Sequence, residues 1–433
     1  MKAYSEYQDS QIEWLEKVPT HWDVISIKGL FQRIKRTNFP KAELLSVYRD
    51  FGVIPKSTRD DNNNKESDDL TPYQLVKVND LVMNKMKAWQ GSIAISEYEG
   101  IVSPAYYVYS PRASSGDKIY PKYIHYLLRN PMYITQYMSR SKGIRVNQWD
   151  LDAEAFEKIE VLLPPKSEQK QIYSFLDKET ARIDTLIEEK QSFINLLEEK
   201  RQALISHVVT KGLDDNVEMK DSGVEWIDEI PAHWTECALR RHVIEHRQGY
   251  YTTDDYVDDG VKLLRITDLE KYGKIDGRSA PRVVSKGDLK NYYLKTGDFV
   301  FARTGGAGTF GLVGNLEEPM VYASYLIRFR FNKNICPQFL KFAFQSKPLF
   351  TEITKNVHGG VNQNIHAENI KDAVMPFPEY AEQYEIATYL EAETGRILRL
   401  KEEVLKSIEL LNEHRAALIS AAVTGKIDVR EEV

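Results

Sequence analysis

EQKQIYSFLDKETARIDTLIEEKQSFINLLEEKRQALISHVVTKG, at residues 168–212, occurs twice in this chain of 433 residues. The second copy, residues 382–426, reads EQYEIATYLEAETGRILRLKEEVLKSIELLNEHRAALISAAVTGK. Without any gap, 22 of the 45 aligned positions are identical, and the second copy begins 214 positions after the first (382 against 168). An internal repeat of this length indicates that a structural unit has been duplicated.

A shorter repeat lies upstream of each long one. Residues 9–22, DSQIEWLEKVPTHW, match residues 221–234, DSGVEWIDEIPAHW, at seven of fourteen positions. The interval is 212 positions (221 against 9), so the two halves of the chain are nearly equal in length. Between these anchors the match weakens, although VNDLVMNKM at 78–86 still resembles TGDFVFART at 296–304. The sequence therefore predicts a tandem duplication in which a shared frame surrounds two divergent interiors.

Start and stop signals for a helix flank both copies of the long repeat. Proline precedes each copy, Ser167 is a suitable N-cap for the first, and glycine follows each last turn. These residues are Pro164, Pro165 and Gly212 for the first copy, and Pro376, Pro378 and Gly425 for the second. Each predicted helix has about 42 residues, or roughly 60 Å at 1.5 Å per residue.

Apolar residues recur along both predicted helices at an average spacing of about 3.5, as in a heptad seam. They are Ile172, Leu176, Ile183, Leu186, Ile194, Leu197 and Leu204, and then Ile386, Leu390, Ile397, Leu400, Ile408, Leu411 and Leu418. A seam this long favours two helices packed antiparallel on each other over two core helices of a larger domain. Lys190 stands where the second copy has Val404, and we expect this lysine to set the register of the pair.

The interiors have a different pattern. Alternating stretches such as SIAIS, YYVYS, FVFAR and YLIRFRF predict strands, while PKYIHYLLRN and PQFLKFAFQ predict short helices. The predicted fold class is α/β (α+β): two tandem-duplicated globular domains, separated by two long antiparallel coiled-coil helices with pseudo-twofold symmetry. The predicted boundaries are domain 1 at 1–163, a central spacer helix at 164–213, domain 2 at 214–378, and a C-terminal spacer helix and tail at 379–433.

The composition is that of a globular protein, with 42% hydrophobic and 28% charged residues. A net charge of −6 gives no overall signal for nucleic acid, although a local basic face remains compatible with it. Cys237 and Cys336 are too few for a disulfide framework or a Cys-rich zinc site, so we expect both to be reduced. No apolar run approaches the roughly 18 residues that span a bilayer. We therefore expect a cytoplasmic protein without membrane contact.

Gly306, Gly308 and Gly311 spell GxGxxG after a predicted strand. No helix pattern follows and no other kinase motif accompanies it, so nucleotide binding is disfavoured. We expect the loop at 302–311 instead to bring its backbone close to a phosphate or a groove wall.

Catalytic motifs are missing from the rest of the sequence. It contains no N/D-P-P-Y/F tetrad for amino methylation, no HExxH, no Walker A and no PD…ExK nuclease pattern. His21 and His233 occur in both copies of the short repeat, each beside a tryptophan. We interpret them as a shared packing corner and not as catalytic groups.

Basic residues mixed with amides and aromatics occur in both interiors. Arg and Lys bind phosphates and guanine, and Asn and Gln can pair with adenine through two hydrogen bonds. A single cluster is better explained as a solvated face, but the matching arrangement in both halves favours nucleic-acid contact. The candidates in the first half are Arg33, Lys35, Arg36, Lys85, Lys87, Trp89, Gln90, Arg140, Lys142, Arg145, Asn147 and Gln148. Those in the second half are Arg240, Arg241, Arg247, Gln248, Tyr250, Tyr251, Arg265, Arg303, Thr304, Lys355, Asn356, Asn362, Gln363 and Asn364.

Over essentially its whole length the chain resembles the specificity subunit of type I restriction-modification systems. The PxHW openings, the element LKTGDFVFARTG and the helix at 164–213 carry the resemblance. That helix reads PP…EQ…I…L…ET…ID-x-LI…LLxEKRxALI…VTKGL. The second half departs from this pattern in two places, with VTGKI for VTKGL and FPEYAEQ for PPKSEQ.

The resemblance implies a noncatalytic protein with two target-recognition domains, each reading half of a split double-stranded DNA site. It implies no cofactor in this chain. Two modification subunits, which carry S-adenosylmethionine and methylate adenine, would dock on the helices, and restriction subunits that use ATP and Mg would join them in defence against phage. One alternative is a noncatalytic coiled-coil scaffold that joins two protein-binding domains without binding DNA. A fused methylase is disfavoured by the missing tetrad.

Overall fold

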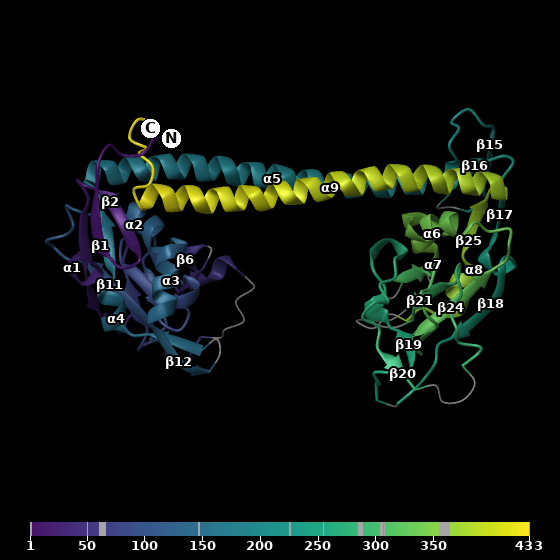
Figure 1. The fold of residues 1–433 in the computed structure, drawn as a ribbon, viewed down its shortest axis with the longest axis horizontal. Coiled ribbons are helices and arrows are strands. Elements are labelled where there is room, and N and C mark those ends of the chain that lie inside the picture. Colours follow the sequence, from purple (N-terminus) through teal and green to yellow (C-terminus); the bar gives the residue numbers. More distant parts are fainter. Residues whose placement is uncertain are drawn as a thin grey trace. The chain divides into compact units, whose positions relative to one another are not determined.

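The computed structural model describes residues 2–49, 51–59, 66–145, 148–224, 227–253, 255–284, 289–303, 306, 308–354 and 364–432. The chain divides into two compact units: unit 1 consists of Met1–Lys190 and Leu405–Val433, and unit 2 of Gln191–Val404. Figure 1 labels the helices and strands of both units. Each of the two long helices contributes one segment to each unit.

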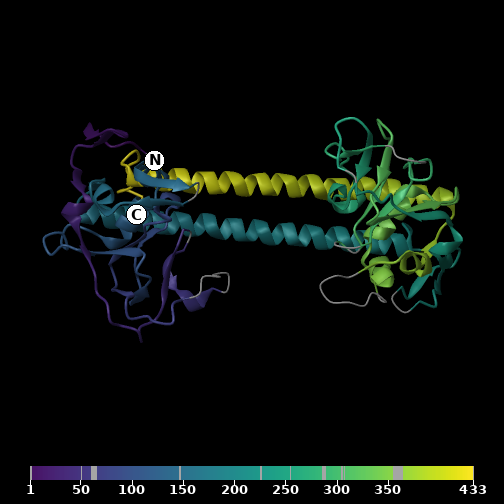
Figure 2. The ribbon, with the colours of Figure 1, turned by 90° about the horizontal axis from the view of Figure 1, so that it is seen from below.

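Helices α5 (Lys166–Lys211) and α9 (Tyr380–Val423) confirm the two predicted long helices. Gly212 and Gly425 have φ values of +82° and +73°, the left-handed conformation with which helices commonly end. Within each unit the α5 segment runs antiparallel beside the α9 segment (Figures 1 and 2). Because α5 already begins at Lys166, Ser167 lies inside the first turn, so its predicted role as N-cap is wrong.

The predicted seam is buried along most of its length. Ile172, Leu176 and Ile183 are buried in the core of unit 1. In unit 2 the buried row on α9 steps by seven through Leu390, Ile397 and Val404. Leu400 lies off this row and is 39% exposed, so its assignment to the seam is wrong. Lys190 is half-buried, and its effect on register stays a prediction.

A four-stranded antiparallel sheet with the order β4-β11-β8-β9 forms the centre of unit 1. Successive side chains of a strand point to opposite faces, so Leu81 joins one apolar cluster and Val82 another. Burial on both faces explains why these strands are almost wholly apolar. The elements are β1 (Tyr7–Ile12), β2 (Leu15–Pro19), β3 (Asp23–Ser26), α1 (Ile27–Leu30), β4 (Phe31–Ile34), β5 (Leu45–Tyr48), β6 (Gly52–Pro55), η1 (Lys56–Thr58), β7 (Gln74–Val76), β8 (Leu81–Asn84), η2 (Ala88–Gln90), β9 (Ile93–Ile95), β10 (Gly100–Val102), β11 (Tyr106–Pro111), α2 (Pro121–Leu128), α3 (Pro131–Arg140), β12 (Ser141–Arg145), β13 (Gln148–Leu151), α4 (Ala153–Glu157) and β14 (Glu160–Leu163).

Unit 2 repeats this topology with the sheet order β18-β24-β21-β22. It differs in a three-stranded sheet where β19 pairs parallel with β23 and antiparallel with β20. The strands and short helices predicted in both interiors are confirmed as β9, β11, β21, β24, α2 and α6. The elements are β15 (Met219–Asp221), β16 (Glu229–Pro231), β17 (Thr235–Ala238), η3 (Leu239–Arg241), β18 (Val243–Gln248), β19 (Val261–Leu264), η4 (Ile266–Asp268), η5 (Lys271–Gly273), β20 (Arg282–Val283), β21 (Phe299–Ala302), β22 (Phe310–Leu312), β23 (Met320–Tyr322), β24 (Leu326–Phe331), α6 (Pro337–Gln345), α7 (Lys347–Thr354), α8 (Ala367–Asp372) and β25 (Val374–Phe377).

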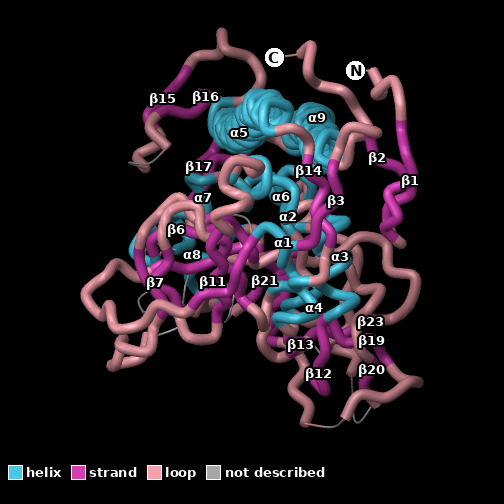
Figure 3. The backbone as a smooth tube through the Cα atoms, turned by 90° about the vertical axis from the view of Figure 1, so that its left-hand side faces the viewer, coloured by secondary structure: helices cyan, strands magenta, loops and turns pink. Residues whose placement is uncertain are grey.

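A short ladder closes the interior of each unit. In unit 1, β3 pairs with β14 (Figure 3), and the Ile27 amide donates to the Ile159 carbonyl at 2.8 Å. In unit 2, β17 pairs with β25, and the Leu239 amide donates to the Ala373 carbonyl at 3.0 Å. Each interior therefore begins and ends at neighbouring points. We call residues 27–159 module 1 and residues 239–373 module 2; the domain boundaries predicted from the sequence stay predictions.

The duplicated His-Trp pair lies against the first turn of a long helix. His21 Nε2 is 2.7 Å from Glu168 Oε2, and Trp22 Nε1 donates to Glu168 Oε1 at 3.0 Å. In unit 2 the same two distances, to Glu382, are both 3.0 Å. A carboxylate is favoured at a helix N-terminus, where backbone N–H groups are unpaired. Both histidines therefore share one structural setting beside a buried tryptophan, as the interpretation of a shared packing corner expects. That neither histidine is catalytic stays a prediction.

The glutamine that follows each of these glutamates fastens the module to the helix. Gln169 accepts from the Tyr120 amide at 2.7 Å and donates to the carbonyls of Lys118 (2.9 Å) and Pro164 (2.7 Å). Gln383 makes the equivalent three bonds, to the Cys336 amide and to the Asn334 and Pro378 carbonyls, at 2.8, 3.1 and 3.0 Å. The Glu-Gln pair is thus repeated because it performs the same structural task in both units.

Candidate nucleic-acid interface

Several predicted residues of module 1 gather where β8 ends. Lys85 Nζ lies 2.8 Å from Asp150 Oδ2 on β13, and the Trp89 and Trp149 ring centroids are 4.9 Å apart. These contacts hold the turn after β8 against the β12–β13 hairpin, in which Asp150 pairs with Lys142. We call this region the basic edge of unit 1. It comprises Lys85, Lys87, Gln90 and Lys142, with Arg145 and Gln148 in the backbone of the same hairpin.

Arg33 on β4 extends the basic edge. Its side chain is exposed, and its guanidinium carbon lies 4.1 Å from the centroid of the Tyr107 ring on β11. Asp150 holds the pKa of the Lys85 ammonium above its ordinary value through their hydrogen bond, against the effects of burial and of the charge on Arg33. Lys85 therefore keeps its charge at neutral pH. Lys35, just beyond β4, is also exposed.

Two other predicted arginines of module 1 are engaged inside it. Arg36 Nη1 is 2.5 Å from Asp80 Oδ2, and its Nη2 donates to Ser110 Oγ at 2.8 Å. The Asp80 side chain is only 3% exposed and also accepts from the Lys77 amide at 2.8 Å. Arg140 turns back onto Gln136 of its own helix. DNA contact by Arg36 and Arg140 stays a prediction, but it would require these bonds to be exchanged.

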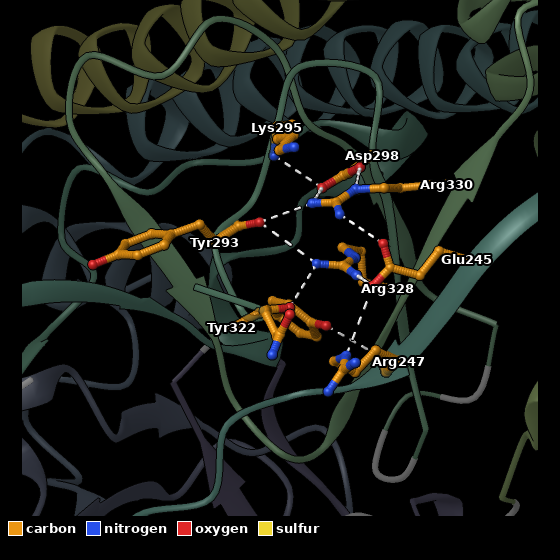
Figure 4. A network of polar contacts seen from close by, with 9 residues as sticks. Glu245, Arg247, Tyr293, Lys295, Asp298, Tyr322, Arg328 and Arg330 are labelled. Atoms are coloured by element: carbon orange, nitrogen blue, oxygen red, sulfur yellow. Dashed lines mark hydrogen bonds and ion pairs between the residues drawn. The ribbon is translucent and has the colours of Figure 1, made fainter. Parts of the chain in front are cut away.

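A network of charged side chains lies behind the outer strand β18 of module 2 (Figure 4). Arg330 Nε is 2.8 Å from Asp298 Oδ1, and its Nη1 is 2.7 Å from Glu245 Oε2. Arg328, whose side chain is fully buried, also bonds Glu245 and donates to the Asn291 carbonyl at 3.0 Å. Burial acts to raise the pKa of Glu245, but the charges of Arg328 and Arg330 outweigh it and hold that pKa below its usual range.

This network fixes the strand that carries the outward-facing candidates of module 2. Arg247 lies opposite Arg328 across β18 and β24, and the Tyr322 hydroxyl donates to the Arg247 carbonyl at 3.2 Å. The Arg247 side chain is exposed, at the rim of the network in Figure 4. Gln248 is exposed and donates to the Ser324 carbonyl at 3.0 Å.

The remaining candidates of module 2 have varied settings. Tyr250 stacks edge-on against Tyr292 with ring centroids 5.6 Å apart, and Tyr251 is 71% exposed. Arg241 is exposed, whereas Arg240 pairs with Asp372. Arg265 is bound to the buried carboxylate of Asp268, with Nη2 2.9 Å from Oδ1. Outside the described residues lie the predicted Asn147, Thr304, Lys355, Asn356, Asn362 and Gln363.

Arg303 follows β21 directly. Its amide donates to the Tyr325 carbonyl at 2.9 Å, and its carbonyl accepts from the Ile365 amide at 3.0 Å. Its side chain is half-buried and has no ion-pair partner among the residues that the structure describes. The backbone is thus held on both sides.

The glycines of the GxGxxG motif admit neighbouring side chains of the same unit. A methyl group at Gly308 would lie 2.3 Å from Phe350 Cε2, and one at Gly311 would lie 2.5 Å from Ile275 Cγ1. The last glycine of the motif, Gly311, lies in strand β22, where a dinucleotide fold needs a helix, which agrees with the sequence-based rejection of that fold. Module 2 itself fills the space beside these two glycines, so its packing already accounts for both of them. The expected approach of the loop 302–311 to a phosphate or groove wall stays a prediction.

Sequence reasoning gave no role to the buried acids that organise both modules. Asp80 and Asp298 occupy matching places in VNDLVMNKM and TGDFVFART, and each accepts from the amide three residues before it at 2.8 Å. The arginine that neutralises the acid comes from different strands, since Arg36 follows β4 and Arg330 lies on β24. The repeated aspartate was a usable signal, but its changing partner left no matching pattern in the sequence.

Among the described residues, no three His, Cys, Asp or Glu side chains gather in a group that could hold a metal ion. In the same part of the chain, no helix is both long and apolar enough to cross a membrane.

Comparisons with known proteins agree with this architecture. The family model for the type I restriction modification DNA specificity domain matches residues 19–196 and 264–410. The chain is 26% identical to the type I restriction enzyme MjaVIII specificity subunit of Methanocaldococcus jannaschii, over 99% of this chain and 98% of that protein. It is 21% identical to the EcoKI specificity subunit of Escherichia coli, over 95% of this chain and 90% of that protein.

Two solved structures share the fold. One, from a study of the assembly and conformational transition of a type I R-M system, superposes with a TM-score of 0.72 at 13% identity and covers 95% of this chain and 99% of that chain. The other is the HsdS subunit from Thermoanaerobacter tengcongensis, with a TM-score of 0.55 at 14% identity, covering 95% of this chain and 98% of that chain. At these identities the likeness establishes the fold alone.

Proposed function

Because the chain belongs to the family of type I restriction modification DNA specificity domains, we propose that it is the noncatalytic subunit that selects the DNA target of a type I restriction-modification complex. Module 1 reads one half of a bipartite double-stranded site and module 2 reads the other half. The observation that carries this proposal is the repeated topology. The same sheet order and the same closing ladder enclose interiors whose exposed residues differ.

The two modules offer the side chains that such reading needs. Arg33, Lys85 and Lys87 suit phosphate contacts that fix the register of the protein on the duplex. Gln90 and Gln248 have amide groups that suit adenine in the major groove, where each base pair presents a distinct pattern. Most of these side chains are exposed, and buried acids behind them hold their strands in place. Each module would read roughly three to five base pairs, with DNA shape contributing as well.

The partners belong to the same proposal. Two modification subunits, which hold S-adenosylmethionine, dock on α5 and α9, and restriction subunits, which use ATP and Mg, join the complex in the cytoplasm. Support comes from large apolar side chains that the helices expose. Leu405 and Leu410 are 42% and 56% exposed in unit 1, and Phe193 and Leu196 are 42% and 60% exposed in unit 2. Large apolar side chains exposed on both long helices suit a protein interface.

Salt dependence of duplex binding tests the function against a scaffold that never binds DNA. Every phosphate that a cation neutralises releases counterions, so log K should fall with log salt at a slope of about −0.9 per phosphate contact. We expect a steep negative slope for the chain assembled with its modification subunit, measured by fluorescence anisotropy between low and physiological salt. Affinity that is absent or independent of salt would favour the scaffold.

Arg303→Ala is expected to weaken binding of the second half-site. If Arg303 reads a base, preference should relax at one position of that half-site, at a cost of about 1 to 3 kcal/mol. The measurement is binding to a set of duplexes in which each position of the target is varied in turn. Arg396→Ala is the matched control, because this exposed arginine of α9 pairs with Glu393 and lies outside both modules. Equal affinity of Arg303→Ala and the wild type would mean that Arg303 is a solvent-exposed residue that makes no contact with DNA.

A further inference from the structure

An aromatic-glycine pair occurs at the same place in both modules. Along the chain, Phe51-Gly52 lies between β4 and β8, and Tyr272-Gly273 lies between β18 and β21. These are the outer and the third strand of the four-stranded sheet in each module. Gly52 and Gly273 have φ values of +73° and +71°. A methyl group at Gly52 would lie 3.1 Å from Cε1 of His125, and one at Gly273 would lie 3.3 Å from Cγ of Lys341. His125 and Lys341 are equivalent, because each stands four residues after the proline that begins its helix, α2 or α6. Phe51-Gly52 and Tyr272-Gly273 are therefore structurally equivalent, although the sequences around them have diverged.

In unit 2 the aromatic residue is bound to the long helices. The Tyr272 hydroxyl donates to Glu198 Oε1 of α5 at 2.8 Å, and Glu198 also pairs with Lys401 of α9. The guanidinium carbon of Arg201 lies 3.9 Å from the centroid of the Tyr272 ring. Burial acts to raise the pKa of Glu198, but the bonds from Lys401 and Tyr272 outweigh it and lower that pKa. The carboxylate thus remains charged and accepts from both partners.

Arg201 itself is held between the helix and the module. It is only 4% exposed, and it bonds the side chain of Gln345 at the end of α6. Tyr272 has φ 65° and ψ 26°, a left-handed conformation that is disfavoured for a bulky side chain. Such a backbone persists only where the surroundings hold it. The contacts with Glu198 and Arg201 supply that hold.

Unit 1 uses the same positions differently. Arg415, which matches Arg201 in the long repeat, has Nε 2.9 Å from Oδ1 of Asp184 and so ties α9 to α5. Leu398 occupies the place of Asp184 in unit 2, so Arg201 has no acid there and turns to the module. Asn412 replaces Glu198.

Phe51 has no hydroxyl group and remains 55% exposed. Arg59 of its own module lies over its ring, with 4.4 Å between the guanidinium carbon and the ring centroid. Between Phe51 and the helices lies a cleft of about 910 Å³, which Asp184, Asn412 and Arg415 also line.

We propose that Tyr272 is a positioning residue, a latch that fastens the loop 269–276 of module 2 to the long helices, and that the described residues of module 1 form no such latch. The loop is a small hairpin in which the Glu270 amide donates to the Lys274 carbonyl and the Asp276 amide to the Asp268 carbonyl, both at 2.9 Å. Ile275 packs on Gly311 of β22, close to the strand that leads to Arg303. The latch therefore steadies Asp268, which binds Arg265, and β22, which pairs with the strand before Arg303. The consequence for DNA rests on the proposed DNA-binding function.

Hydrogen exchange on the full chain without DNA tests the latch itself. Tyr272→Phe keeps the ring and removes only the bond to a charged acceptor. We expect the amides of Glu270 and Asp276 to exchange roughly tenfold faster, as loss of one such bond implies, while amides of β21 and β24 are unchanged. Glu198→Ala removes the acceptor of the same bond and should have a similar effect on these amides, and adding Tyr272→Phe to it should speed their exchange little further, because the bond is already absent. Unchanged exchange in 269–276, additive effects, or faster exchange throughout unit 2 would each overturn the latch.

Methylation by the assembled complex tests the consequence for DNA. We expect Tyr272→Phe to methylate targets whose gap is one base pair longer or shorter several-fold more than the wild type does, with both half-site sequences unchanged. Phe51→Leu is the matched control, and we expect wild-type tolerance of the gap because, among the described residues, Phe51 makes ring contacts only within its own module. A Tyr272→Phe complex with wild-type tolerance would overturn the positioning role. Absence of methylation by the wild-type complex would instead contradict the proposed function. The latch would then be judged by the hydrogen-exchange experiment alone, which needs no DNA.

Discussion

Replacing residues 27–159 with the corresponding segment of another specificity subunit is expected to change one half of the methylated target completely and to leave the other half intact. The physical reason is the ladder of β3 and β14, which brings both ends of module 1 together. The frame residues Trp22 and Glu168 lie outside the exchanged segment and keep their bonds. A module that enters and leaves its frame at neighbouring points can be exchanged without moving that frame.

The measurement is a map of methylated adenines in DNA exposed to the chimaeric chain together with its modification subunit. Exchange of residues 239–373 is the reciprocal experiment and should change only the other half. The chimaeric chain without the modification subunit is the negative control, because we expect neither methyl transfer nor cleavage of DNA from this chain alone. Simultaneous loss of both halves in a folded chimaera would contradict independent modules.

Glu168→Ala is expected to destabilise unit 1 by about 3 to 5 kcal/mol, because it leaves two buried donors without an acceptor. The Tyr4 hydroxyl donates to Glu168 Oε1 at 2.7 Å and Trp22 Nε1 donates to it at 3.0 Å. Trp22 is 2% exposed, so water cannot replace the carboxylate. Hydrogen exchange of unit 1 amides gives the free energy for that unit alone, which a single unfolding midpoint of a two-unit chain does not.

Two further variants provide a comparison for the loss of stability expected of Glu168→Ala. Glu168→Gln keeps one acceptor oxygen and should lose less stability than Glu168→Ala. Glu382→Ala removes the matching residue of unit 2, where the side chain is 29% exposed and Trp234 supplies the buried donor; we expect about 1 to 2 kcal/mol there. Equal losses at Glu168 and Glu382 would show that the helix N-terminus, which both share, matters more than the buried donors.

The parts of the fold that the sequence predicted are those governed by local or repeated patterns. Periodic apolar residues, prolines and terminal glycines place α5 and α9, and alternation places β9, β11, β21 and β24. The predictions that failed depend on finer placement. Ser167 misses the cap position because the helix begins at Lys166, and Leu400 misses the seam because the buried row steps by seven.

The candidate interface was predictable only as a set of residue types. Lys85 and Lys142 were candidates because basic residues are mixed there with amides and aromatics, but 57 positions separate them in the chain (142 against 85). Their approach depends on the bond from Lys85 to Asp150 and the packing of Trp89 on Trp149. Likewise, Arg36 was a candidate by type, and only the fold assigns its guanidinium to the buried Asp80.

The sequence by itself determined the duplication, the two long helices and the family, because repeats and helical periodicity are properties of the chain read in order. Only the tertiary structure decided what each repeated residue does. Arg201 and Arg415 occupy the same place in the long repeat, yet Arg201 stacks on Tyr272 of module 2, whereas Arg415 pairs with Asp184 of the neighbouring long helix. The reason is physical: a long cationic side chain binds whichever acid or ring lies within its reach, and those partners come from distant segments that only folding brings together.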